Sequence, residues 1–199
     1  VIGARSWVNN MYDEQKSAQI AAWFLAQEGG TMPHLKLMKL MYLADREAMR
    51  TGGFPMTGDR FVSMPHGPVL VNTLNHINDD SFSVPGGWDD WIGDKANYEV
   101  ALIRQATTET LDRLSRADLQ VLSAVWCQFG HMTKYQIRDY THDPRNCPEW
   151  KDPNGSSNPI AYNTVFEALG FQSDFATSMA AEIEAQNTIA RELAEPIAA

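Results

Sequence analysis

Apolar residues recur at helical spacing along most of the chain, which predicts a mainly α protein. Asp13 is a good N-cap for a first helix that ends before Gly29 and Gly30. The next predicted helix, at about 33–50, is apolar on nearly every side, as is typical of a buried element. We therefore expect a compact helical bundle built around this central helix, with a small antiparallel β-hairpin at its side.

Start signals place further helices in the second half of the chain. Ser115 with Asp118, and Thr133 with Gln136, have the spacing of a capping box. They predict helices over about 116–129 and 134–140. A proline-rich connection, a short helix near 160–169 and a last helix from Ser173 complete the expected order.

Residues 58–70 combine a strand, a turn and a predicted helix start in one short segment. Phe61, Val62 and Met64 suit a strand, which Pro65 would end. We expect Gly67 to be the N-cap and Pro68 the first residue of a helix at 68–78, so that His66 lies exposed beside the helix N-terminus. A second strand at 97–103 is expected to pair with the first.

Length and composition indicate one soluble domain. The 199 residues can bury a large apolar core, and we expect an N-terminal arm at 1–12 and a single domain at 13–199. No run of about 18 apolar residues and no export signal is visible, so we expect a cytoplasmic protein that does not engage membranes. Two cysteines without paired spacing, Cys127 and Cys147, favour free thiols.

The net charge of −9 repels phosphate backbones, so nucleic acid is not the expected partner. Four cations of the central helix nevertheless share one face: Lys36, Lys39, Arg46 and Arg50. This basic stripe is either a solvated face or a contact strip for an acidic surface on a partner.

No pattern of catalytic or metal-binding residues stands out, so we expect neither an enzyme nor a cofactor. The histidines lack metal-ligand spacing, although His66, His131, His142 and Asp45 could still converge in space. Such convergence would be needed for an alternative function, a metal-dependent enzyme of unrecognised type. Cys127 falls among apolar residues, as a buried inert thiol would, and Arg145 could lower the pKa of Cys147.

The 57–68 corner is the best candidate interface. In one interpretation Asp59, Arg60 and His66 form a polar cluster for a partner, with Met64 in its apolar centre. In the other, Asp59 binds turn amides and Arg60 pairs with Asp45 or Glu47, which would fix the corner onto the central helix.

Residues 116–141 also permit a helix-turn-helix, with Lys134 and Arg138 facing outward. A DNA-binding transcriptional regulator is therefore an alternative function. Because Asp139 and Asp143 lie near these two cations, a core-packed helical corner fits this segment better.

Two sequence blocks resemble a known family. The first joins the basic helix to the corner and includes Asp45, Gly58, Pro65, Gly67 and Pro68; it reads Lys36-Leu37-Met38-Lys39-Leu40-Met41-Tyr42-Leu43-Ala44-Asp45-Arg46-Glu47, Gly52-Gly53-Phe54-Pro55-Met56-Thr57-Gly58-Asp59-Arg60 and Met64-Pro65-His66-Gly67-Pro68-Val69. The second runs from Gly130-His131-Met132-Thr133 through Tyr140-Thr141-His142 to Pro148-Glu149-Trp150-Lys151.

In this order and spacing, roughly residues 14–170 resemble the Panacea, or SocA-like, antitoxin domain of bacteria and phages. The resemblance implies an antitoxin that neutralises a cognate toxin by direct protein contact, with the toxin encoded by the adjacent gene. For some members it also implies presentation of the toxin to a protease.

Overall fold

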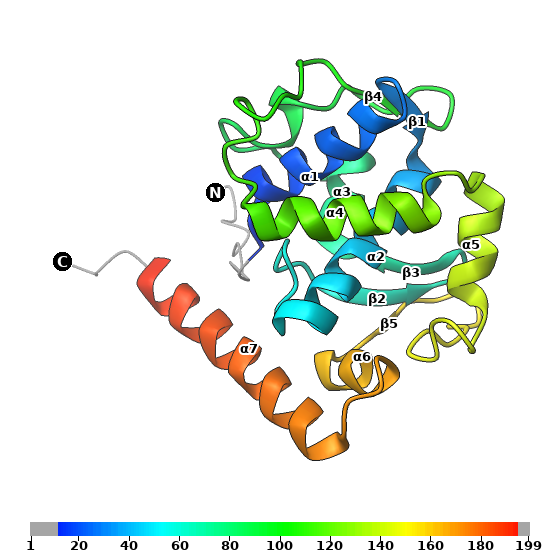
Figure 1. The fold of residues 1–199 in the computed structure, drawn as a ribbon, viewed down its shortest axis with the longest axis vertical. Coiled ribbons are helices and arrows are strands. Elements are labelled where there is room, and N and C mark those ends of the chain that lie inside the picture. Colours follow the sequence, from blue (N-terminus) through cyan, green and yellow to red (C-terminus); the bar gives the residue numbers. More distant parts are fainter. Residues whose placement is uncertain (1–11, 195–199) are drawn as a thin grey trace, which may run out of the picture.

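The computed structural model describes residues 12–194 and shows a mainly α fold with two small antiparallel sheets (Figure 1). In chain order the elements are α1 (Glu14–Gln27), β1 (Thr31–Pro33), α2 (His34–Gly52), β2 (Phe61–Met64), β3 (Gly67–Leu70), α3 (Val71–Ile77), the 3₁₀ helix η1 (Trp88–Asp90), β4 (Glu99–Ala101), α4 (Arg116–Phe129), α5 (Lys134–His142), β5 (Asn158–Pro159), α6 (Tyr162–Ala168) and α7 (Ser173–Ala194). None of the helices within residues 12–194 is both long and apolar enough to cross a bilayer.

Helix α2 supplies much of the buried core. Leu37, Leu40, Met41 and Tyr42 are completely buried, and α2 contacts α1, α3, α4, α5 and α6. Its C-cap Gly53 has a φ of 81°, in the left-handed region that glycine adopts without strain. The expected burial of this helix is confirmed.

The predicted helix starts are also confirmed. Asp13 accepts a hydrogen bond from the amide of Lys16, and complete capping boxes begin α4 at Ser115 and α5 at Thr133. Helices α4 and α5 both pack on α2. The caps therefore fix where these two helices begin over the core.

The prediction of a helix starting at Gly67 is wrong. Gly67–Leu70 is β3, which pairs antiparallel with β2, and α3 begins at Val71. The strand order is β3-β2-β5, so β3 is an edge strand. An edge strand tolerates Pro68 because its missing N–H does not interrupt a ladder on the outer side.

The pairing expected for the second strand is wrong as well. Strand β4 pairs with β1, with Val100 opposite Met32, whereas β5 is the other neighbour of β2. Figure 1 shows the β1–β4 pair at the end of the molecule away from α6. The buried side chains of Met32 and Val100 explain this choice, because both join the main core.

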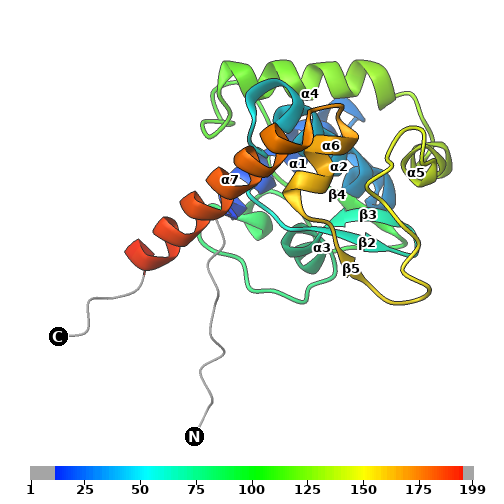
Figure 2. The same cartoon turned by 90° about the horizontal axis from the view of Figure 1, so that it is seen from below.

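Helix α7 packs chiefly on α6, and its buried residues include Ala176, Ala180 and Ile183. Figures 1 and 2 show its C-terminal half extending beyond the other elements.

Candidate functional site: a clamped hairpin tip

The turn between β2 and β3 presents two exposed residues, Pro65 and His66, on an otherwise packed hairpin. Side chains from three other parts of the chain bind the backbone of this tip. Trp150 Nε1 donates to the Met64 carbonyl at 3.1 Å, and Lys39 Nζ donates to the Pro68 carbonyl at 2.7 Å.

The third bond of the clamp joins the His142 ring to the backbone of His66. This bond raises the pKa of His142, as expected when an imidazole N–H donates to a carbonyl, but burial outweighs it and the net pKa is lowered. The clamp therefore consists of Lys39 from α2, His142 from α5 and Trp150 from the loop after α5, and it holds residues 64–68 in one conformation.

His142 and Trp150 form a stack whose ring centroids are 4.4 Å apart and whose planes differ by 3°. Gly67 lies against it with a φ of 95°. A β-carbon at Gly67 would lie 2.8 Å from both His142 Nε2 and Lys39 Nζ. Position 67 therefore requires glycine for its backbone angle and for the space that the clamp occupies.

Lys39 is completely buried, and burial lowers the pKa of its ammonium group to about 7. Cys147 lies in the same region, where burial raises the pKa of its thiol to about 12. The prediction that Arg145 could activate Cys147 is wrong, because desolvation exceeds the effect of nearby positive charge. Cys127, expected to be buried, is exposed on α4.

A buried carboxylate connects the loop of the clamp to α2. Glu149 Oε1 accepts hydrogen bonds from Tyr42 Oη at 2.6 Å and from Arg46 Nε at 2.7 Å. Arg46 also donates to the Asn146 carbonyl at 2.9 Å. These bonds hold residues 146–150 on α2 and so position Trp150 beside the tip.

Two buried aspartates shape the chain on either side of Gly58, which has a φ of 64°. Asp45 accepts from the amides of Met56 and Thr57, at 2.9 and 3.0 Å, and from the Thr57 hydroxyl. Its burial raises its pKa to about 7, against the opposing effect of these bonds.

Asp59 accepts from the amides of Arg60, Asn72 and Thr73 at 2.7–2.9 Å. The interpretation that it satisfies turn amides is correct, and because Asp59 is completely buried it cannot contact a partner in this conformation. The expected pairing of Arg60 with Asp45 or Glu47 is wrong. Arg60 is exposed, and Glu47 pairs instead with Arg50 at 2.6 Å.

The basic stripe is not an exposed face. Lys36 is buried and bonds Glu28 and the Gly130 carbonyl, while Lys39 and Arg46 serve the clamp and its support. Arg50 is exposed. All four cations therefore bind acceptors within the chain, because Arg50 pairs with Glu47, and Arg50 alone among the four is exposed.

The histidines do not assemble a metal centre. His66 and His131 are exposed, His142 belongs to the clamp, and Asp45 is occupied by backbone amides. Within residues 12–194 no three His, Cys, Asp or Glu side chains are grouped so that they could hold a metal ion.

Lys134 and Arg138, the two cations that a DNA-binding helix-turn-helix would present, contact neighbouring residues on α5 instead. Arg138 pairs with Asp139 at 2.6 Å, and both Lys134 and Arg138 lie over the Tyr135 ring. No feature of α5 favours phosphate binding over this local arrangement.

Comparison with known families identifies a match over the region that contains the clamp. A family model described as Antitoxin SocA-like, Panacea domain matches residues 37–151. The matched range contains Lys39, Gly67, His142 and Trp150, and hence the complete clamp. No curated protein and no solved structure matches the chain.

Proposed function

Because the chain belongs to the Antitoxin SocA-like, Panacea domain family, we propose that it is an antitoxin that neutralises a cognate toxin by direct protein–protein contact. The proposal places it in the cytoplasm, with its toxin encoded by the adjacent gene. Neutralisation on this account is a binding event, in which no covalent bond is made or broken.

The clamped hairpin tip is the proposed docking surface. Pro65 and His66 are exposed, Met64 is half-buried, and Arg60 is exposed where the chain enters β2. Inside the tip, the clamp binds the backbone at Met64, His66 and Pro68. This combination of an exposed apex and a fixed backbone is the observation that carries the docking assignment.

A fixed tip favours binding for an energetic reason. Association costs free energy for each loop or side chain that becomes ordered at the interface. A tip that is already ordered avoids that cost, so exposed groups at Arg60, Pro65 and His66 can contribute more of their contact energy to affinity.

Affinity for the purified toxin tests the docking surface. We expect His66→Ala and Arg60→Ala each to weaken binding about tenfold or more, the usual effect of truncating an interface anchor. The melting temperature should stay unchanged, because neither side chain is used within the described fold. His131→Ala and Arg116→Ala are matched controls, since both residues are exposed and neither belongs to the hairpin or to its clamp.

Two results would contradict the assignment: unchanged affinity in both tip variants, or equal weakening in the controls. Growth rescue by co-expression with the adjacent gene tests the antitoxin role separately. Presentation to a protease would appear as a shorter toxin half-life in cells that contain the antitoxin than in cells without it.

A further inference from the structure

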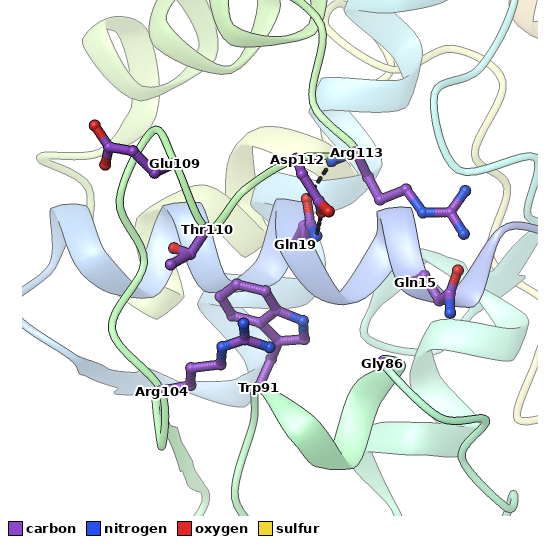
Figure 3. Close-up of a pocket in the computed structure, with 9 residues that line it drawn as sticks. All are labelled: Gln15, Gln19, Gly86, Trp91, Arg104, Glu109, Thr110, Asp112 and Arg113. Carbon is purple, nitrogen blue, oxygen red and sulfur yellow. Dashed lines mark hydrogen bonds between the residues drawn. The ribbon is translucent and has the colours of Figure 1, made fainter.

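A pocket of about 380 Å³ lies between α1 and the loop that precedes α4 (Figure 3), and none of the clamp residues lines it. The lining residues that matter here are Gln15, Gln19, Trp91, Arg104, Asp112 and Arg113. Its volume is within the range of small-molecule sites. The antitoxin function proposed above does not use it.

Hydrogen bonds within the chain fix the walls of the pocket. The buried Gln19 donates to Asp112 Oδ1 at 2.7 Å and accepts from the Arg113 amide at 2.8 Å, which holds the loop against α1. Gln15 Nε2 donates to the Pro85 carbonyl at 2.7 Å. The pocket is therefore formed before any ligand arrives.

The pocket contains two hydrogen-bond donors, one of them cationic, that the rest of the described chain does not use. The Arg104 guanidinium carbon lies 4.4 Å from the centroid of the Trp91 ring, in the stacked arrangement visible in Figure 3. Arg104 has no hydrogen bond or ion pair with any residue that the structure describes. Its N–H groups, which lie in the plane of the guanidinium group, are therefore available to an anion. The indole N–H of Trp91 also has no acceptor among residues 12–194.

The pocket contains unused acceptors too. One oxygen of Asp112 is bound by Gln19, which leaves the other available, and the carbonyl oxygen of Gln15 makes no bond within the described residues. The Glu109 side chain points away from the other labelled side chains in Figure 3, and its carboxylate accepts a hydrogen bond from Thr107. Arg113 is about half exposed and lies 3.7 Å from Asp13.

We propose that this pocket binds a free amino acid. Its carboxylate would pair with Arg104 and the Trp91 N–H, and its ammonium group with Asp112 and the Gln15 carbonyl. A zwitterion binds both sets of groups, whereas a simple anion would use only the donors and would lie near the negative charge of Asp112. The remaining space admits the side chain of the ligand.

Titration calorimetry with each of the twenty protein amino acids tests the proposal. Acetate, which has only the carboxylate, and methylammonium, which has only the ammonium group, are the comparison ligands. We expect at least one amino acid to bind with a dissociation constant of about 1 mM or tighter. Acetate and methylammonium should each bind at least about tenfold more weakly, because each satisfies only one set of groups.

Substitutions of pocket residues test whether the amino acid binds in this pocket. Arg104→Gln and Asp112→Asn should each weaken the amino acid about tenfold or more. Arg116→Gln, which removes the same charge from an exposed position outside the pocket, should have no effect. Melting temperatures measured in parallel identify any variant that has lost its fold.

Three outcomes would overturn the proposal. They are no binding by any of the twenty amino acids, equal binding by acetate, or full binding by a folded Arg104→Gln protein. Because toxin affinity depends on other residues, failure here would leave the antitoxin proposal standing.

Discussion

Gly67 meets two demands that only glycine satisfies together. Its φ of 95° is costly for any residue with a β-carbon, and that atom would collide with His142 and Lys39. We predict that Gly67→Ala lowers the free energy of unfolding by about 3 kcal/mol, the sum of backbone strain and overpacking. Urea denaturation measures this change.

Gly29 provides the control for Gly67. It has the same φ of 95°, yet nothing lies within 4 Å of the position of its missing β-carbon. Gly29→Ala should therefore cost only the backbone strain, about 1–2 kcal/mol. If both substitutions lower the free energy of unfolding equally, the clamp is not tightly packed around Gly67.

Lys39 predicts a pH dependence of stability. In the unfolded chain its pKa is near 10.5, whereas burial lowers its pKa to about 7 in the folded protein. Above pH 7 the unfolded state therefore binds more protons, and the stability contribution of Lys39 rises with pH. Between about pH 7 and pH 8.5, the unfolding free energy of the native protein should increase relative to Lys39→Met, by at most about 1.4 kcal/mol per pH unit.

The comparison with Lys39→Met isolates this residue from its neighbours. Cys147, whose pKa is raised to about 12, titrates in the unfolded chain only near pH 9 and acts in the opposite direction. His142, whose pKa is lowered, is neutral in this range. If the unfolding free energies of the native protein and of Lys39→Met change in parallel with pH, Lys39 stays charged when it is buried.

The roles of the lysines were not predictable from helix spacing. Spacing placed Lys36 and Lys39 on one face of α2, but it contains no information about what covers that face. The covering groups come from distant segments, the Gly130 carbonyl for Lys36 and the Pro68 carbonyl for Lys39. The available signal was the presence of lysines in a nearly all-apolar helix. Burying a lysine costs free energy unless its ammonium group binds an acceptor, so each buried lysine indicates an acceptor nearby.

Among the elements, α3 depends on a residue outside it. Its N-cap, Leu70, has no side-chain acceptor, and the Asp59 carboxylate binds the amides of Asn72 and Thr73 instead. We predict that Asp59→Ala costs about 2–4 kcal/mol, because buried N–H groups lose their acceptor. The amide of Thr73 should then exchange with solvent faster than in the native protein.

Asp80→Ala is the matched control for Asp59→Ala, since Asp80 is exposed just after the other end of α3. It should leave both stability and exchange at Thr73 unchanged. Normal protection of Thr73 in Asp59→Ala would mean that another group caps this helix.

Helices with local start signals were predictable, and the strands were less so. The caps of α1, α4 and α5 involve residues three apart, which a sequence displays directly. By contrast, Gly67-Pro68 resembles a helix start, and its strand conformation depends on β2 and on the clamp. The partner of β4 is β1, far away in the sequence, and short strands alone do not specify such pairing.

At the scale of the molecule, the two sequence blocks contain both halves of the clamped hairpin tip, but the sequence did not show how they are joined. His142 and Trp150 were singled out with the corner, and the structure brings them to its tip. Tyr42 and Glu149, which hold the loop in place, were quoted within the two blocks without a role. Only the structure shows that the buried Glu149 carboxylate accepts hydrogen bonds from Tyr42 and Arg46 on α2.

These long-range contacts predict that the core unfolds as one unit. Helix α2 packs on five other helices, and the clamp ties the hairpin and the 142–150 segment to it. In urea, far-UV circular dichroism, which reports the helices, and tryptophan fluorescence, which reports the surroundings of the six tryptophans, should give one midpoint and a slope of about 2 kcal/mol/M. A fluorescence change at lower urea, with helicity retained, would show that part of the tertiary packing is lost before the helices unfold, and it would contradict unfolding as one unit.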